Sequence, residues 1–371
     1  MTSKLKRYFP IIREREEILE EILQSDQLRN TFEIWPEERQ EEFLDFCAGI
    51  RGLKILYDTF FKEILHPTIH RERLASFISA ILGQKIKILQ VLPLESPRIA
   101  DETSLLLMDI VVQLEDGTIV NIEMQKVGYA FPGQRCACYS ADLLLRQYKY
   151  LKDQKDIKFS YRDIKTVCTI VIFEKSPEIF RSFPEHYIHR FSQQSDTGLQ
   201  LDLLQNFYLI PLDIFQKRPH NNLINTPTEA WLSFLSTDDP EQIITLLEAF
   251  PEFKEIYQDI YEICCNIERV MQMFSKELQE LDRNTVEYMI DEMQEELNTA
   301  KTTIKNMGEY IAEVEEQKAE AERQKAEAER QKAEAERQKV KDAQRIAELE
   351  HLLAEATKKY PLNEFNEMRR L

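Results

Sequence analysis

The chain has 371 residues and a formal net charge of −18 at pH 7, and its hydrophobic fraction of 43% is sufficient for the core of one or two domains. No stretch of about 18 apolar residues occurs, which excludes a membrane-spanning helix, and the basic start of the chain lacks the apolar segment of a signal peptide. The spacing of the six cysteines excludes the common zinc patterns, so we expect a reduced protein of the cytoplasm.

The hydrophobic pattern predicts helices at the start of the chain and an α/β region after them. Apolar residues recur at helical spacing in four segments, 11–24, 36–47, 50–64 and 71–82. The next expected elements are a strand at 86–92, a hairpin at 104–113 and 118–125, a helix at 133–151 and strands at 164–173 and 206–215. Because the segment 164–173 is rich in β-branched residues, we expect that strand to be buried on both faces. From Thr228 onward the pattern is helical throughout.

The hairpin contains an Asp-Gly turn at 116–117, and its register can be derived from the sequence. A two-residue loop would pair Ile110 with Glu123, whereas a three-residue loop with Gly117 in the left-handed region pairs Ile110 with Ile122. A one-residue slip turns every side chain to the opposite face. The three-residue loop is favoured because it gathers one apolar face, formed by Ile110, Val112, Val120 and Ile122.

This register predicts a polar cluster on the other face of the hairpin. Asp109 lies opposite Glu123, and Gln125 follows on the same side of the strand. Two carboxylates this close repel each other unless a cation lies between them. A single aspartate at the end of a strand is usually an ordinary polar residue, but the paired carboxylates and the amide suit a divalent metal held against a phosphodiester.

The order of these residues resembles a known nuclease arrangement. An Asp, followed about a dozen residues later by Glu-x-Lys across a hairpin, is the pattern of the PD-(D/E)XK nucleases, with Gln125 at the lysine position here. The segment Asn121-Ile122-Glu123-Met124-Gln125 closely resembles the PD-(D/E)XK family transposases, also called recombination-promoting nucleases (Rpn). The helix with Asp58-x-x-Phe61-Lys62, the helix at 74–82 and the residues Arg135, Tyr139 and Tyr161 extend the resemblance over about residues 50–215.

The resemblance implies roles for individual residues. Asp109 and Glu123 are expected to bind Mg²⁺ or Mn²⁺, with the backbone carbonyl of Met124 as a third ligand. Gln125 can orient a water molecule by hydrogen bonds but cannot offset charge as a lysine does. Arg135 is the expected phosphate contact. Asp58 and Tyr139 are auxiliary candidates.

Basic residues on the helix expected at 133–151 have two interpretations. Arg146, Lys149 and Lys152 recur every three residues, and Lys155 and Lys158 continue the series. Such a stripe either follows the phosphates of DNA or forms a solvated helix face. The first three of these residues, together with Lys126, are the candidate DNA contacts. No helix-turn-helix or zinc-finger pattern occurs, so we expect low sequence specificity.

The negative charge is concentrated after the nuclease-like region. Residues 51–237 carry 21 acidic and 22 basic residues, whereas residues 238–297 carry 17 acidic and 4 basic ones. This acidic segment should repel nucleic acid, or cover the site in a resting state.

The C-terminal part contains seven-residue repeats at 315–342, rich in helix-favouring Glu, Lys, Gln and Ala. Apolar residues precede the repeats in steps of three and four, at Ile290, Met293, Leu297, Ala300, Ile304, Met307, Ile311 and Val314. The same spacing returns at Ile346, Leu349, Leu353 and Ala356, and the heptad phase is preserved between the two parts. One interpretation is a dimeric coiled coil with a weak centre. The other is a single helix stabilised by charge pairs and acting as a spacer.

Together these features predict an α/β fold with a restriction-endonuclease-like core, in which helices flank a mixed sheet, followed by an all-helical C-terminal region with a long coiled-coil-like helix. We expect N-terminal helices at 1–48, the nuclease-like domain at 49–220, an acidic helical region at 228–300 and the heptad-repeat helix at 301–360. The predicted function is Mg²⁺-dependent DNA endonuclease activity of the recombination-promoting type, by a homodimer joined through the C-terminal helix. The alternatives are a catalytically silent nuclease fold that binds DNA or a partner, and a coiled-coil interaction protein in which the fold is a scaffold.

Overall fold

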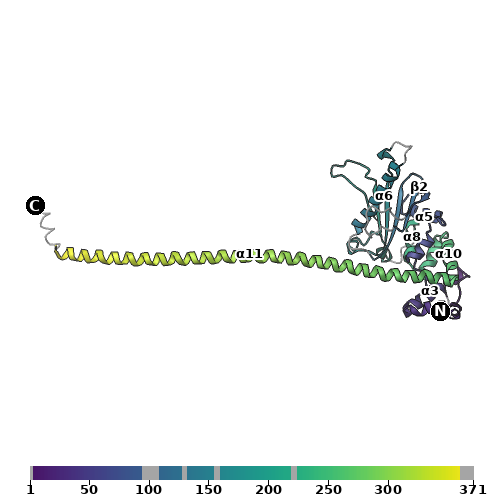
Figure 1. Ribbon diagram of the computed structural model, residues 1–371, viewed down its shortest axis with the longest axis horizontal. Coiled ribbons are helices and arrows are strands. Elements are labelled where there is room, and N and C mark those ends of the chain that lie inside the picture. The colour runs from purple at the N-terminus through teal and green to yellow at the C-terminus, as the bar shows by residue number, and fades with distance from the viewer. Residues whose placement is uncertain (1–2, 94–107, 128–131, 154–158, 219–223, 360–371) are drawn as a thin grey trace. The chain divides into compact units, whose positions relative to one another are not determined.

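The computed structural model describes residues 3–93, 108–127, 132–153, 159–218 and 224–359. The chain divides into two compact units, Met1–Glu292 and Met293–Leu371. The first unit contains the β-sheet and the helices around it (Figure 1). The second contains the distal part of the last helix, α11 (Ile267–Lys359). In the described part of the chain, no helix combines the length and the apolar character that a membrane span requires.

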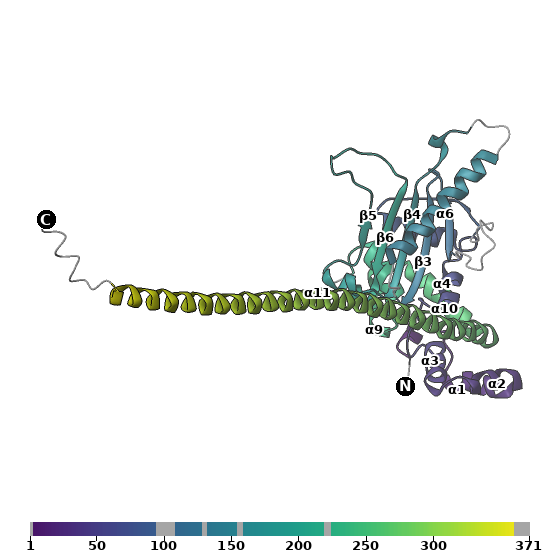
Figure 2. The same cartoon turned by 60° about the vertical axis from the view of Figure 1, so that its left-hand side comes forward.

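A mixed sheet of six strands forms the centre of the first unit, in the order β1-β2-β3-β4-β6-β5 (Figure 2). The strands are β1 (Ile88–Val91), β2 (Ile110–Leu114), β3 (Ile119–Val127), β4 (Val167–Lys175), β5 (His189–Phe191) and β6 (Gln205–Pro211). The pairs β1–β2, β2–β3 and β5–β6 are antiparallel, and the pairs β3–β4 and β4–β6 are parallel. Helix α6 (Pro132–Asp153) connects the parallel strands β3 and β4, as a crossover helix must.

Both faces of the central strands are buried. On one face, Ile110, Val112, Val120 and Ile122 join the main core together with helices that precede and follow the sheet in the sequence. On the other face, Tyr139 and Leu143 of α6 pack against Val111, Ile119 and Val167. The hairpin face that carries Asp109 and Glu123 is therefore apolar near the turn, where Val111 and Ile119 pack against α6.

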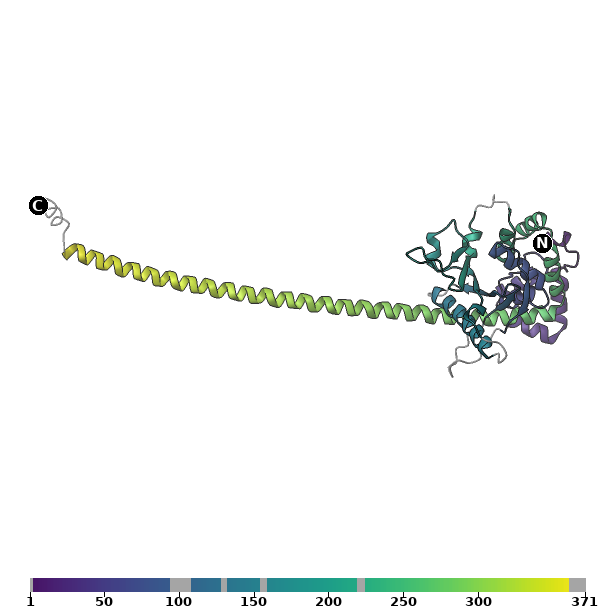
Figure 3. The ribbon, with the colours of Figure 1, turned by 90° about the horizontal axis from the view of Figure 1, so that it is seen from above.

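The main core unites elements that are distant in sequence. Its helices are α1 (Arg15–Gln24), α2 (Asp26–Ile34), α3 (Glu37–Cys47), α4 (Asp58–Ile64), α5 (Arg71–Leu82), α8 (Pro227–Ser236), α9 (Pro240–Ala249), α10 (Phe253–Cys265) and the first turns of α11. The short helix α7 (Leu212–Gln216) follows β6. The N-terminal helices, purple in Figure 3, lie beside the first turns of α11, where the rings of Trp35 and Phe274 are 5.1 Å apart. The acidic segment thus contributes to the core through α9, α10 and α11, and it is no detachable cover.

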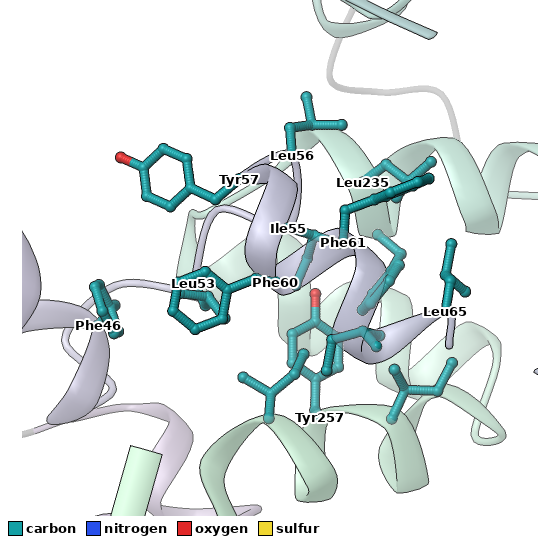
Figure 4. Close-up of a cluster of buried hydrophobic side chains, with 14 of the residues drawn as sticks. Phe46, Leu53, Ile55, Leu56, Tyr57, Phe60, Phe61, Leu65, Leu235 and Tyr257 are labelled. Carbon is teal, nitrogen blue, oxygen red and sulfur yellow. The ribbon is translucent and has the colours of Figure 1, made fainter. Parts of the chain in front are cut away.

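The apolar side chains of helix α4 anchor it in the main core. Phe60, Phe61 and Ile64 are fully buried, and Figure 4 shows the first two among side chains that include Leu235 of α8 and Tyr257 of α10. Asp58 and Lys62 are four residues apart, so they share the side of the helix that this cluster leaves open.

The expected strand and helix types are mostly confirmed, and the deviations have local causes. The helix expected at 50–64 begins only at Asp58. The Gly52 amide donates to the Asp238 carbonyl at 2.7 Å, and this contact holds the segment before Asp58 in a non-helical conformation. The helix expected at 11–24 begins only at Arg15, and the next helix, α2, which Ser25 caps, was missed. The strand expected at 206–215 ends at Pro211, where α7 begins, so its second half was wrong. The short strand β5 was missed. Residues 104–107 of the expected hairpin lie outside the described residues.

Candidate active site

The hairpin of β2 and β3 has the predicted three-residue loop. Ile110 pairs with Ile122, and Val112 pairs with Val120. The Leu114 amide donates to the Thr118 carbonyl at 2.8 Å, and Gly117 has a φ of +88°, the left-handed conformation that favours glycine. The same register places Asp109, directly before β2, opposite Glu123 of β3.

Asp109 is held by two different donors. The backbone amide of Met124 donates to Oδ2 of Asp109 at 2.8 Å. The ammonium group of Lys62, on α4, lies 3.0 Å from Oδ1. Burial raises the pKa of Asp109, the Lys62 charge opposes this rise, and the nearby Asp58 adds to it. Asp109 is therefore positioned by the strand backbone and balanced by one lysine.

Glu123 is the more deeply buried of the two carboxylates. Its side chain is buried beneath α6, and among the described residues its Oε1 atom finds no hydrogen-bond partner. Burial and the neighbouring charge of Asp109 raise its pKa to about 8, although Arg135 opposes the rise. A carboxylate in this position gains from a cation that neutralises both acids.

The family of the chain follows from a comparison with protein-family models. The model described as PD-(D/E)XK nuclease family transposase matches residues 55–289. The chain belongs to this family. The match includes the hairpin, α4 and α6, and it continues through α8, α9 and α10 into the first turns of α11, beyond the region where the sequence resemblance was recognised. No curated protein and no solved structure matches the chain.

In this PD-(D/E)XK chain, the start of α6 supplies the residues above Glu123. The Nε atom of Arg135 donates to the hydroxyl of Tyr139 at 3.0 Å. Burial and the charge of Glu123 raise the pKa of Tyr139 to about 12. The same two causes raise the pKa of the Cys136 thiol to about 12. The guanidinium of Arg135 is thus oriented by Tyr139 close to the carboxylates.

The third motif position, Gln125, is buried and neutral. Its Oε1 atom has no hydrogen-bond partner within the described part of the chain, and the same holds for both amide atoms of Asn121 and for the hydroxyl of Thr169. Asn121 pairs with Thr169 across β3 and β4, so the unpaired atoms of these residues lie along adjacent strands. Buried polar atoms normally have partners, and this row suits ordered water next to Glu123.

Helix α4 contributes Lys62, to which the sequence reasoning assigned no role at the site, and the auxiliary candidate Asp58. Asp58, the first residue of α4, lies 2.9 Å from the Lys62 ammonium group, which thereby bridges Asp58 and Asp109. The spacing of Asp58 and Lys62 by four residues is a helical ion-pair signal, and it was visible in the sequence. The contact with Asp109, far along the chain, was not.

Lys126 does not have the position expected of a DNA contact. Its side chain is only 8% exposed, and its ammonium group pairs with the buried carboxylate of Glu277 on α11. It also lies 4.5 Å from the centre of the Tyr57 ring. Lys126 therefore belongs to the interior between β3, α4 and α11, and a DNA phosphate cannot reach it in this structure.

The other candidate DNA contacts lie at the far end of α6. Lys149 is 14 residues beyond Arg135, which corresponds to about 21 Å along a helix. Lys149 and Lys152 are exposed, whereas Arg146 pairs with Asp142 at 2.6 Å and donates to the Pro93 carbonyl at 2.9 Å. The structure does not bring these three residues together with the carboxylates.

The donors present suit a divalent metal with oxygen ligands. The described residues contain no group of three or more His, Cys, Asp or Glu side chains arranged for a metal ion. Two carboxylates are nevertheless sufficient for Mg²⁺, which keeps several waters in its coordination shell. The unpartnered Oε1 of Glu123 and the opposing position of Asp109 fit such an ion.

Proposed function

We propose that the protein is a metal-dependent DNA endonuclease of the transposase-associated, recombination-promoting type with low sequence specificity. The observation that carries this proposal is the position of half-buried Asp109 opposite buried Glu123, with one carboxylate oxygen of Glu123 lacking a hydrogen-bond partner among the described residues. Membership in a nuclease family supports it. Free thiols at the six cysteines fit a reducing compartment, and we place the protein in the cytoplasm.

The metal, Mg²⁺ or Mn²⁺, would be held by Asp109 and Glu123. In an extended strand the N–H and C=O of one residue point to the same side. Because the Met124 amide faces Asp109, we propose its carbonyl as the third protein ligand. The bound metal would lower the pKa of a water molecule and offset the charge that develops at phosphorus.

The chain's own residues position the substrate and the water. Arg135, oriented by Tyr139, binds a phosphate oxygen through charge-assisted hydrogen bonds. The Gln125 amide orients the attacking water. The water oxygen forms a bond to phosphorus as the bond from phosphorus to the leaving oxygen breaks, and the proton lost by the water is balanced by one gained by the leaving oxygen.

Cleavage of supercoiled plasmid DNA with Mg²⁺ or Mn²⁺ tests this proposal. We expect nicking by the unmodified protein and its loss in Asp109→Asn and Glu123→Gln, since both substitutions keep the side-chain shape and remove the charge. Glu115→Gln is the matched control, because Glu115 is an exposed carboxylate in the loop of the same hairpin. Equal nicking by all four proteins would exclude this site.

A second candidate function is supported by Gln125, which lacks the charge of the motif lysine. In that case the protein would be a catalytically silent nuclease fold that binds DNA or acts through its long helix. The two candidates separate in one experiment: DNA binding without nicking, at any of several concentrations of Mn²⁺, would favour the silent form.

We further propose that α11 forms a homodimer. Apolar side chains at heptad spacing are exposed on it, among them Met307, Ile311, Ile346 and Leu353. Such a stripe is typical of a coiled coil whose partner helix covers it. The charged repeats between the two apolar parts would leave the centre of that coil weak.

A further inference from the structure

The site contains a lysine that the motif spacing does not identify. The Lys62 ammonium group lies 3.0 Å from Oδ1 of Asp109 and 2.9 Å from Oδ1 of Asp58, and the Lys62 side chain is 40% exposed. The motif position that should carry a lysine holds the neutral Gln125. We propose that Lys62 supplies this missing cation from α4 and is a catalytic residue that contacts the scissile phosphate. This inference rests on the proposed nuclease function.

The position of Lys62 is fixed before any substrate binds. Phe60, Phe61 and Ile64 anchor α4 in the core, and Figure 4 shows the two phenylalanines among other buried side chains. Asp58 holds the ammonium group from within the same helix. A charge that is positioned in advance stabilises a transition state without the cost of reorganisation.

The balance of charge favours a role toward the phosphate. Asp58, Asp109 and Glu123 place three acidic groups around the site. When a divalent cation neutralises Asp109, Asp58 still holds Lys62 at the site, and the ammonium group becomes available to a phosphate oxygen. The other nearby lysine, Lys126, is buried in its pair with Glu277 and faces the interior.

The alternative role for Lys62 is structural, as a counter-ion that only neutralises Asp58 and Asp109. A structural counter-ion and a catalytic cation differ in two measurable respects. Removing a counter-ion leaves the bound metal to replace its charge, so cleavage persists. Removing a catalytic cation eliminates cleavage while the metal still binds, and a lysine introduced at the motif position should restore the activity.

The experiment compares Lys62→Gln, Lys62→Arg, Gln125→Lys and the double variant Lys62→Gln/Gln125→Lys in the full chain. Three quantities are measured: plasmid nicking, Mn²⁺ affinity by calorimetry and the thermal unfolding midpoint. We expect Lys62→Gln to lower the nicking rate by about 100-fold or more, the effect of losing one preorganised charge contact. Its Mn²⁺ affinity should be unchanged or higher, because a competing cation is gone.

Nicking by the double variant should be at least about tenfold faster than nicking by Lys62→Gln, a difference of about 1.4 kcal/mol in activation free energy. Lys62→Arg should keep more activity than Lys62→Gln. Lys87→Gln, which removes an exposed lysine that pairs with Glu115, is the matched control and should behave as the unmodified protein.

Two results would overturn the inference while leaving the proposed function intact. The first is nicking by Lys62→Gln at the rate of an active unmodified protein. The second is a loss of nicking that is accompanied by a lower Mn²⁺ affinity or unfolding midpoint and is not restored by Gln125→Lys. The absence of nicking by the unmodified protein with every metal would instead overturn the proposed function, and the inference with it.

Discussion

The carboxylate of Glu277 on α11 pairs with the ammonium group of Lys126, the residue that directly follows Gln125 on β3. Glu277 has no exposed surface. It also accepts a hydrogen bond from the Thr59 amide on α4 at 3.4 Å, and the Thr59 hydroxyl donates to the Met273 carbonyl at 3.1 Å. The buried carboxylate of Glu277 thus links the start of α11 to β3, which carries the motif, and to α4, which carries Lys62.

Glu277→Gln should destabilise the protein by about 3–5 kcal/mol, because it removes the carboxylate that offsets a buried positive charge. The measurement is urea unfolding of the full chain. The double variant Glu277→Gln/Lys126→Met should recover most of the loss, since it removes the positive charge as well. Glu313→Gln, at an exposed position of α11, is the control. A loss below about 1 kcal/mol in Glu277→Gln would contradict the proposed importance of the pair.

The metal-free protein should become less stable as the pH rises from about 5 to about 8. The folded chain keeps a proton on Glu123 up to a pKa of about 8, whereas an unfolded glutamate loses it near its ordinary value of 4.5. The folded state therefore binds more protons in this range, and the free energy of unfolding falls by at most about 1.4 kcal/mol for each pH unit. The raised pKa of Asp109 acts in the same direction.

Urea unfolding in EDTA at several pH values measures this dependence. Glu123→Gln should flatten the curve, because the amide does not titrate. Addition of Mn²⁺ should also flatten it, since the metal replaces the proton at the carboxylates. A Glu123→Gln protein with an unchanged pH dependence would assign the effect to another group.

Gly117→Ala should lower stability by about 1–2 kcal/mol, the cost of the left-handed conformation for a residue with a side chain. Its φ is +88°, and an added Cβ would lie 2.8 Å from Cγ of Lys165. Gly133→Ala is the matched control, because the residue is helical and, apart from its own helix backbone and chain neighbours, no described atom lies within 4 Å of its added Cβ. Urea unfolding of both variants tests the prediction, which fails if they are equally stable.

Substitution of the apolar stripe on α11 should abolish dimer formation without unfolding the helix. In Ile311→Asp/Ile346→Asp we expect a monomer in sedimentation velocity at concentrations where the unmodified protein is a dimer, because each substitution places a charge in the coiled-coil seam. Ala312→Asp, next to the stripe, should keep the dimer. An unmodified chain that remains monomeric at all concentrations would favour the single-helix spacer.

The hairpin shows how far the sequence could predict this site. Its register depended on a local quantity, the alternation of apolar side chains around one turn, and the structure confirms the predicted pairing of Ile110 with Ile122. The burial of β4 on both faces was likewise confirmed, because a run of β-branched residues has a direct physical meaning.

Contacts between distant segments could not be predicted in this way. Lys62 and Asp109 meet because α4 packs on the sheet, and no periodicity in either segment encodes that packing. Lys126 looked like a DNA contact because it is a basic residue beside the motif. Its partner Glu277 lies in the acidic segment that was expected to repel nucleic acid or to cover the site. Only the packing of the first turns of α11 shows that this carboxylate is buried.

The first turns of α11 also determine when the core can close during synthesis of the chain. The ribosome makes the sheet and α4 before it makes Phe274 and Glu277, so the core around these two residues remains open until they emerge. Residues 293–371 belong to the second unit, and the core can therefore close while they are still being translated. A chain that stops before residue 277 would expose apolar surface and be prone to aggregation. An unfinished chain would thus lack the packing that fixes α4, and the proposed nuclease site would be assembled only late in translation.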